Sequence, residues 1–370
     1  MKSKSIGEPL VILAVIAVTV SSPSTRPAQS GTASTSETPA KPLVLEKNEG
    51  EQRTWRPEAG ESDLGGFVIK VSPKNNGSQH LVLLTDDLAP GDAIPTHKHL
   101  GQDEIVFVIK GTIHVHMGDQ ERDLHAGGTV FIPAYTWVNV KNIGAEPVSS
   151  VTIFSAPGFE DHLRCESVLA NERPATISRK EENECDHMGH VVYQGRGEKD
   201  PGAGTTTPNT AKPLLLEKNE GERRVVRGWP GHPDPGETFI LKVDPKNGGS
   251  KHLVLMTADI KPGGAIDAHR HPDSDEILFL QAGTVRVHLG DAVRDVHAGA
   301  IVFIPANTWI SVESIGNDVI SSFAVFSSPG FEDFLRAVSV REGEKNVPMS
   351  EAENNAAEKL HSHDVIYKEP

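Results

Sequence analysis

Apolar and polar residues alternate in short runs along most of the chain, and turn-forming residues separate these runs. Runs such as HLVLL, EIVFVI, TIHVHM, GTVFIP and SVTIF lie between clusters of Gly, Pro, Asn and Asp. Alternation with a period of two is typical of β-strands that bury one face. No long stretch with a helical period interrupts the runs. The pattern therefore predicts an all-β fold, either a sandwich or a jelly-roll barrel.

One pair of adjacent runs, EIVFVIKGTIHVHMGD, predicts which side chains face the interior. A turn at Lys110-Gly111 would pair the two runs as a hairpin. Because paired residues share a face, Glu104 would point into the barrel together with Val106 and the other apolar residues. His114 and His116 would point outward.

The whole pattern occurs twice. KPLVLEKNEGE recurs as KPLLLEKNEGE, and FIPAYTWVNV recurs as FIPANTWISV. Each copy has about 150 residues, the ordinary size of a domain, whereas solenoids use shorter and more numerous units. We therefore expect two tandem domains, residues 41–194 and 212–370. The segment between them, residues 195–211, is rich in Gly, Pro and Thr and is expected to be a linker.

Each domain is expected to end in a short helical appendage. Phe331 and Phe334 have helical spacing, and farther on residues 178–181 and 350–353 have the spacing of a capping box. The first helix of each appendage opens with an aromatic residue, Phe159 or Phe331. That helix could cover a barrel mouth as a lid, but core packing is the more common use of a buried aromatic ring.

The composition limits the partners of the protein. With 370 residues, 37% of them hydrophobic, the chain can bury two ordinary cores. Its formal net charge of −15 argues against binding of nucleic acids or anionic membranes, which requires basic patches. We expect a small-molecule substrate or ligand instead.

Residues 1–40 are expected to form an export signal or anchor followed by a flexible tether. Lys2 and Lys4 precede an apolar run from Leu10 to Val20, which is too short to span a bilayer. The following residues are rich in Ser, Thr, Pro and Ala. No clear cleavage site follows the run, so an uncleaved membrane anchor stays an alternative. We expect an exported protein, periplasmic or extracellular.

The two cysteines, Cys165 and Cys185, lie in the tail of the first copy. Their equivalents in the second copy are Ala337 and Ala357. Joint presence in one copy and joint absence from the other is expected of a bonded pair, and export would permit a disulfide. Two inert free thiols are the alternative, and the sequence does not decide between them.

Two histidines and a glutamate occur with the same spacing in both copies. The two sets, 172 residues apart, are His97, His99, Glu104, His269, His271 and Glu276. Two imidazoles and one carboxylate can hold a divalent transition metal and leave coordination positions open for a substrate. Residues between the ligands differ freely between the copies, whereas all three ligand types are kept. The sequence therefore predicts one metal site in each copy.

These spacings resemble the first motif of the cupin superfamily, and the whole chain looks like an exported bicupin. The motif is Gly, five residues, His-x-His, three or four residues, Glu, six residues, Gly. The chain supplies its glycines at Gly91, Gly111, Gly263 and Gly283. The resemblance covers roughly residues 41–164 and 212–336 and implies two tandem jelly-roll barrels. Since single-domain cupins commonly dimerise, it also implies a monomer with an internal pseudo-twofold axis.

The second cupin motif is incomplete in both copies. The family pattern is Gly, five residues, Pro-x-Gly, two residues, His, three residues, Asn. Val138 and Ile310 stand at its histidine position, and Tyr135 and Asn307 stand at the glycine of Pro-x-Gly. The fourth metal ligand of the family is therefore missing.

Three interpretations of the missing ligand stay open. In the first, each site binds metal through three ligands, with Val138 or Ile310 as an apolar wall beside the open position. In the second, His80 and His252, which occupy equivalent positions, supply the fourth ligand. In the third, the sites bind an organic ligand without metal. A set of two histidines and one carboxylate suits Fe(II), so iron is favoured over manganese, nickel and zinc.

Two classes of function follow from this resemblance. Since FSAPGFEDHLR resembles the end of quercetin-dioxygenase-like cupins, the leading hypothesis is a metal-dependent oxidoreductase, a dioxygenase acting on a small organic substrate. The resemblance implies that Glu104 and Glu276 are also catalytic, as proton acceptors once they dissociate from the metal. The alternative is a non-enzymatic module that binds or senses a small ligand without metal.

Overall fold

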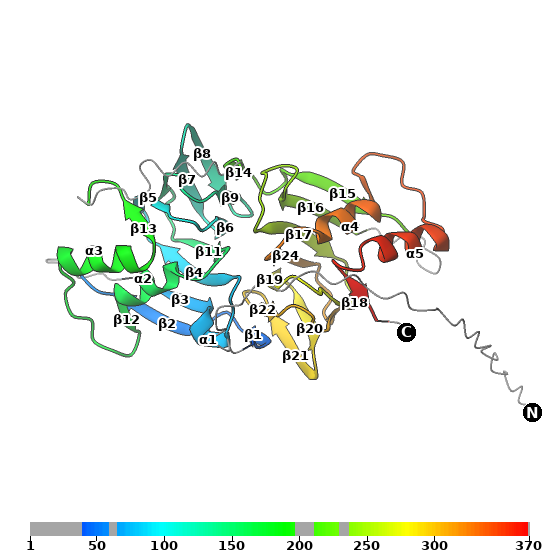
Figure 1. The fold of residues 1–370 in the computed structure, drawn as a ribbon, viewed down its shortest axis with the longest axis horizontal. Helices are drawn as coiled ribbons and strands as arrows, with labels where there is room; N and C mark the ends of the chain where they lie inside the picture. The colour runs from blue at the N-terminus through cyan, green and yellow to red at the C-terminus, as the bar shows by residue number, and fades with distance from the viewer. Residues whose placement is uncertain (1–38, 59–64, 197–210, 229–236, 369–370) are drawn as a thin grey trace, which may run out of the picture. The chain divides into compact units, whose positions relative to one another are not determined.

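The fold is mainly β, as the alternating pattern predicts, and each half of the chain forms a jelly-roll barrel (Figure 1). The structure is a computed structural model that describes residues 39–58, 65–196, 211–228 and 237–368. The predicted export signal lies outside these residues, as does most of the predicted linker. Within the described part of the chain, no helix is long and apolar enough to cross a membrane.

In the first half, the described residues form twelve strands and three helices after an initial strand, β1 (Leu43–Leu45). They are β2 (Glu51–Trp55), β3 (Gly66–Val71), α1 (Pro73–Asn76), β4 (Val82–Leu88), β5 (Ala93–His99), β6 (Glu104–Lys110), β7 (Thr112–Met117), β8 (Gln120–His125), β9 (Thr129–Ile132), β10 (Val138–Asn142), β11 (Val148–Phe154), α2 (Phe159–Cys165), β12 (Ser167–Leu169), α3 (Arg179–Met188) and β13 (Val191–Tyr193).

The second half repeats this order after its own initial strand, β14 (Leu214–Leu216), except that its described residues include no counterpart of α1. Its elements are β15 (Glu222–Val226), β16 (Thr238–Val243), β17 (Val254–Ile260), β18 (Ala265–Arg270), β19 (Glu276–Ala282), β20 (Thr284–Leu289), β21 (Ala292–His297), β22 (Ile301–Ile304), β23 (Ile310–Ser314), β24 (Ile320–Phe326), α4 (Phe331–Ala337), β25 (Ser339–Arg341), α5 (Glu351–Leu360) and β26 (Ile366–Tyr367).

The initial strand of each half belongs to the barrel of the other half. β1 pairs with β22 of the second half, and β14 pairs with β9 of the first (Figure 1). Each barrel has one eight-stranded and one five-stranded antiparallel sheet, and the exchanged strand is the edge of the larger sheet. The two halves are therefore interlocked through main-chain hydrogen bonds.

A fully buried lysine fixes the turn after each exchanged strand. Lys70 Nζ donates hydrogen bonds of 2.7 to 3.0 Å to the main-chain oxygens of residues 46, 47 and 49. Lys242 Nζ donates to the main-chain oxygen of Glu217 at 2.6 Å. Burial lowers the pKa of each lysine to about 8. Charge-assisted bonds to carbonyl oxygens offset the cost of burying the ammonium groups.

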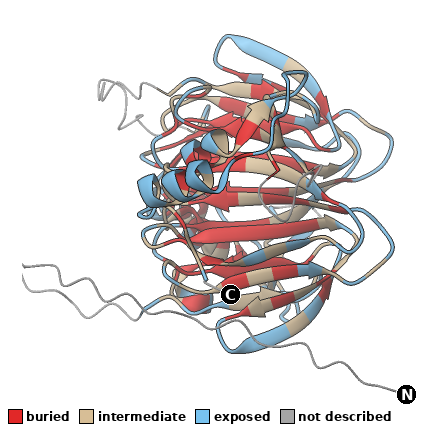
Figure 2. Cartoon of the chain, turned by 90° about the vertical axis from the view of Figure 1, so that its right-hand side faces the viewer, coloured by how far each residue is buried: buried red, intermediate tan, exposed pale blue. Residues whose placement is uncertain are grey.

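The two eight-stranded sheets also share an apolar core. The rings of Phe107 and Phe323 meet across the halves at 4.6 Å, and Phe279 stacks on Phe323 at 4.9 Å. The buried residues follow the strands, whereas exposed residues gather in loops and on outer helix faces (Figure 2). Residues 39–370 consequently form one compact unit.

The prediction that the two strands on either side of Lys110-Gly111 pair with each other is wrong. The prediction of which side chains point into the barrel and which point outward is confirmed. β6 pairs with β9 and β11, whereas β7 pairs with β8 and β10, so the chain crosses between the sheets at Gly111. Gly111 has a φ of 91°, and a Cβ there would lie 2.8 Å from the side chain of Val148, so glycine is required. Val106 still faces the core shared by both strands, and His114 and His116 are outside it.

The predicted helical appendages are present in both halves. Ser178 caps α3 by accepting from the main chain of Glu181, whose carboxylate accepts in return from the main chain of Ser178. Ser350 and Glu353 form the same capping box at α5. Both helix starts predicted from the sequence are therefore confirmed.

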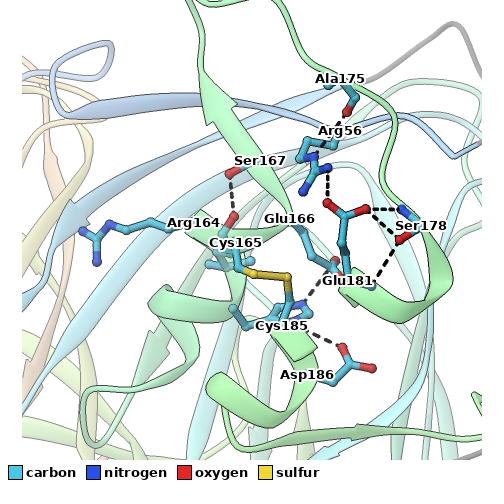
Figure 3. The surroundings of a disulfide bond; sticks show 12 residues. Arg56, Arg164, Cys165, Glu166, Ser167, Ala175, Ser178, Glu181, Cys185 and Asp186 are labelled. Atoms are coloured by element: carbon cyan, nitrogen blue, oxygen red, sulfur yellow. Dashed lines mark hydrogen bonds and ion pairs between the residues drawn. A yellow bond between two sulfur atoms is a disulfide. The ribbon is translucent and has the colours of Figure 1, made fainter. Parts of the chain in front are cut away.

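The appendages are held by different means. In the first half, a disulfide joins Cys165 at the end of α2 to Cys185 in α3 (Figure 3). Of the two alternatives for the cysteines, the structure has the bonded pair. In the second half, an apolar cluster replaces the covalent bond. Its buried members are Phe334, Met349, Ala357 and Val365.

Candidate metal sites

Each barrel brings together the two histidines and the glutamate of its repeat. In the first barrel, His97 and His99 lie on β5 and Glu104 begins β6. One donor atom from each of the three side chains lies within 4.8 Å of the others, and all three side chains are buried. The same arrangement in the second barrel is formed by His269, His271 and Glu276.

Main-chain oxygens orient three of the imidazoles. In His97 and His269, Nδ1 lies 2.8 Å from the main-chain oxygen two residues earlier. In His271, Nδ1 lies 2.7 Å from the main-chain oxygen of Asp364. A proton on Nδ1 satisfies each of these contacts and leaves Nε2 as the electron-pair donor. This is the arrangement by which proteins present histidine to a metal.

Several buried donor atoms in the two clusters have no hydrogen-bond partner within the described part of the chain. They are His99 Nδ1, His99 Nε2, Glu104 Oε2, His271 Nε2 and Glu276 Oε2. His99 Nε2 lies 3.2 Å from Glu104 Oε2, and His271 Nε2 lies 3.6 Å from Glu276 Oε2. Buried polar atoms are seldom left unpaired, and converging imidazole and carboxylate donors suit a divalent transition metal. The residues present in both barrels therefore fit such an ion.

Burial sets the charge of these groups. It lowers the pKa of His97 to about 4, with His99 adding repulsion, and lowers that of His271 to about 3, with His269 adding repulsion. It lowers the pKa of His269 as well. All three imidazoles are therefore neutral at pH 7, the form that binds metal. Burial raises the pKa of Glu276 to about 8, so this carboxyl group retains a proton unless a cation replaces it.

An apolar residue lies at the position of the missing fourth ligand. Val138 on β10 pairs with His97, and Ile310 on β23 pairs with His269. Both side chains are buried. This geometry agrees with the first interpretation of the altered motif, an apolar wall beside a three-residue cluster.

The second interpretation, in which His80 and His252 supply the fourth ligand, is wrong. Both residues are exposed. His80 Nδ1 lies 3.0 Å from Asp275 Oδ2, a residue of the opposite half. The two histidines precede β4 and β17, so the alternation of those strands does not direct them into a barrel.

The residues that replace the motif glycine keep the conformation of a glycine. Tyr135 and Asn307 have φ values of 67° and 63°, in the left-handed region. Their main-chain N–H groups donate to the main-chain oxygens of His99 and His271, at 2.8 and 2.6 Å. The altered turn therefore still supports the second histidine of each cluster.

Aromatic rings pack against the histidines of both clusters. The ring of Phe159, at the start of α2, meets that of His99 edge-on at 4.5 Å, and Tyr193 on β13 lies 5.4 Å from His97. The equivalents in the second barrel are Phe331 and Tyr367, at 4.5 and 5.7 Å from the matching histidines. Phe159 is part of an apolar core cluster, as expected for core packing. Sequence reasoning missed the tyrosines, which lie in tails beyond the cupin motifs.

Comparison with known proteins agrees with this architecture. The sequence profile of the cupin domain family matches residues 85–154 and 256–326. Quercetin 2,3-dioxygenase of Bacillus subtilis is 20% identical over 280 residues, which cover 72% of this chain and 77% of that protein.

Among solved structures, oxalate decarboxylase from Lactobacillus farciminis in complex with formate has a TM-score of 0.53 at 18% identity, covering 81% of this chain and 88% of that one. A point mutant of Bacillus subtilis oxalate decarboxylase has a TM-score of 0.53 at 15% identity, covering 90% of each chain. At these identities the structural likeness concerns the fold. The chain carries one cupin domain in each half and is therefore a bicupin.

Proposed function

We propose that both barrels bind a divalent transition metal and that the protein is a dioxygenase-like oxidoreductase acting on a small organic substrate. The observation that carries the proposal is the set of buried donor atoms without partners, in His99, Glu104, His271 and Glu276. The similarity to a quercetin dioxygenase supports the class of reaction.

The donor set favours iron. Two histidines and one carboxylate with open positions are typical of non-heme Fe(II) sites. Manganese is the second candidate, because one similar solved structure, with a TM-score of 0.52 at 15% identity, concerns the Mn(II) centres of Bacillus subtilis oxalate decarboxylase. When bound, the metal would supply Lewis-acid and redox chemistry.

The residues of this chain would position the substrate and accept its proton. Val138 and Ile310 offer no ligand, which leaves room for a substrate oxygen and keeps the adjoining space apolar. Glu276, whose pKa burial raises to about 8, would hold a proton taken from the substrate once its carboxylate is free. Glu104 has the corresponding place in the first barrel.

The test is metal content per chain, measured by plasma mass spectrometry on protein purified without added metal or chelating resin. The wild type is expected to hold about one ion per barrel, and His97→Ala/His269→Ala is expected to lose both. A wild-type protein that stays metal-free after anaerobic reconstitution would contradict the proposal. The protein would then be a non-enzymatic bicupin that binds a small ligand directly.

We also propose that the protein is exported. The disulfide between Cys165 and Cys185 supports this, since such bonds persist in oxidising compartments, and so does the short apolar run near the N-terminus. Cell fractionation of full-length protein and of a variant lacking residues 1–40 tests it. The full-length protein should be found outside the cytosol and the shortened one inside; full-length protein retained in the cytosol with free thiols would contradict export.

A further inference from the structure

A third cluster of metal-ligand side chains lies in the tail of the first half. It consists of His162 on α2, Glu166 just after α2, and Asp186 on α3, with one donor atom of each within 4.8 Å of the others. His162 Nε2 lies 3.4 Å from Glu166 Oε2, and Asp186 Oδ1 lies 3.4 Å from the other ring nitrogen. In a tetrahedral site with bonds of 2.0–2.1 Å, neighbouring donor atoms are about 3.3 Å apart. The two carboxylates face opposite nitrogens of the ring, so a single ion would bind one ring nitrogen and one carboxylate, and the second carboxylate would have to move toward it from within 4.8 Å.

The histidine of this cluster is buried and incompletely bonded. Only 1% of the side chain of His162 is exposed, and its Nδ1 has no hydrogen-bond partner among the residues that the structure describes. Its Nε2 has two long contacts, each of 3.4 Å, with the hydroxyl of Tyr193 and with Glu166 Oε2. Burial lowers the pKa of His162 to about 3, so the ring is neutral and can donate an electron pair.

One arginine, Arg196, pairs with both carboxylates. Arg196 lies 2.9 Å from Asp186 Oδ1 and 3.3 Å from Glu166 Oε1. The other oxygen of Glu166, Oε2, is the one that faces His162. Asp186 Oδ1, by contrast, faces both His162 Nδ1 and Arg196. An ion at the ring would therefore share Asp186 with the guanidinium group, whereas Glu166 offers it a separate oxygen.

Acidic side chains gather around the cluster. A third acidic residue, Glu182 on α3, is also buried and pairs with Arg179 at 2.7 Å. Buried charges are costly unless they are paired, and burial raises the pKa of Glu166 to about 7. A bound divalent cation would favour the charged form of the Glu166 carboxylate.

The second half shows that this tail can pack without such a cluster. Phe334, Val338 and Glu358 stand at the positions of the three ligands. Phe334 belongs to the apolar cluster that holds the second tail. Packing of the helices alone therefore does not require a histidine and two buried carboxylates in the first half.

The disulfide fixes the two acidic residues relative to each other. Cys165 directly precedes Glu166, and Cys185 directly precedes Asp186 (Figure 3). The bond between the cysteines therefore limits how far the two carboxylates can separate. Preorganised ligands lose less conformational freedom when an ion binds.

We propose that His162, Glu166 and Asp186 form a third divalent-metal site, which among the described residues has no counterpart in the second half and which the disulfide preorganises. A nitrogen and two carboxylate donors suit zinc and similar transition metals. Its three ligands are distinct from those of the two barrel sites, and the proposal does not rest on the proposed oxidoreductase activity.

The experiment is a Zn²⁺ titration by calorimetry in a background that lacks the barrel histidines, with alanine at residues 97, 99, 269 and 271. One equivalent is expected to bind. His162→Phe/Glu166→Val, which copies the second half, should weaken binding at least about 100-fold, and the control Glu358→Gln should leave it unchanged. Cys165→Ala/Cys185→Ala should weaken zinc binding about tenfold, because the ligands are no longer preorganised. The bond is removed by substitution and not by a reductant, because the free thiols would bind zinc themselves.

Two outcomes would overturn the proposal: no zinc binding in this background, or undiminished binding by folded His162→Phe/Glu166→Val. Circular dichroism verifies the fold. If the background variant does not fold, the same double substitution in the otherwise wild-type chain must lower the bound zinc by one equivalent. Failure of the barrel sites would instead appear as metal that the substitutions at residues 97, 99, 269 and 271 do not remove and that His162→Phe/Glu166→Val does.

Discussion

Val138 lies directly opposite His97 on neighbouring strands, where cupins carry a fourth ligand. Val138→His should place a third imidazole beside the first two and tighten metal binding in the first barrel by at least about tenfold, or 1.4 kcal/mol. Chelator competition measures this affinity, in a background that keeps only the first-barrel site. The control is Val140→His, two residues along the strand and opposite Ile94. Equal affinities of both variants and the wild type would show that Val138 does not border the site.

Removal of metal should make stability fall as pH rises, through Glu276. Its folded pKa is about 8 and its unfolded value about 4.5. Between these values the folded state binds the extra proton, so the free energy of unfolding decreases with pH, by at most about 5 kcal/mol in total. Urea unfolding of chelator-stripped protein from pH 5 to 8.5 should show this loss, and Glu276→Gln should remove it. The same pH profile in both proteins would contradict the assignment.

Lys70→Met should destabilise the protein by about 3 kcal/mol, because three main-chain carbonyl oxygens lose the buried ammonium group that donates to them. The comparison is Lys74→Met, which changes an exposed lysine nearby and should have little effect. Urea unfolding gives both values. A loss below 1 kcal/mol for Lys70→Met would mean that water or a shift of the turn satisfies these oxygens.

Cys165→Ala/Cys185→Ala should lower the free energy of unfolding by about 3 kcal/mol, since the bond closes a loop with a sequence separation of 20. The substitutions copy Ala337 and Ala357 of the second half, so no steric conflict is expected. In thermal unfolding experiments, a reductant should lower the stability of the wild type by the same amount and should not change the stability of the variant. A reductant-insensitive wild type would argue against a stabilising bond.

Local patterns were sufficient to predict the strands, the capping boxes and the two barrel clusters. Alternation reveals which residues of a strand share a face, and spacing within one strand and its neighbour places His97, His99 and Glu104 together. Pairing partners depend on distant segments. Nothing local shows that the chain changes sheets at Gly111, so the predicted hairpin joined strands that belong to different sheets.

The third cluster could not be found by comparing the repeats, because it occurs in only one of them. His162, Glu166 and Asp186 also come from two helices, and their proximity depends on how these helices pack. One signal was available in the sequence: an acidic residue follows each cysteine, so a disulfide would bring two carboxylates close together. The error for His80 arose because the residue precedes its strand, where alternation gives no information.

The exchange of β1 and β14 makes each barrel incomplete without its neighbour. Two separate single-repeat chains would have to meet in solution to trade these strands, so their folding would depend on protein concentration. In one polypeptide the partner is always present. A symmetric pair of identical chains would also carry every substitution twice. The fused chain is free of that constraint, which is why a disulfide and a buried ionic cluster can exist on one side while the other side keeps an apolar tail.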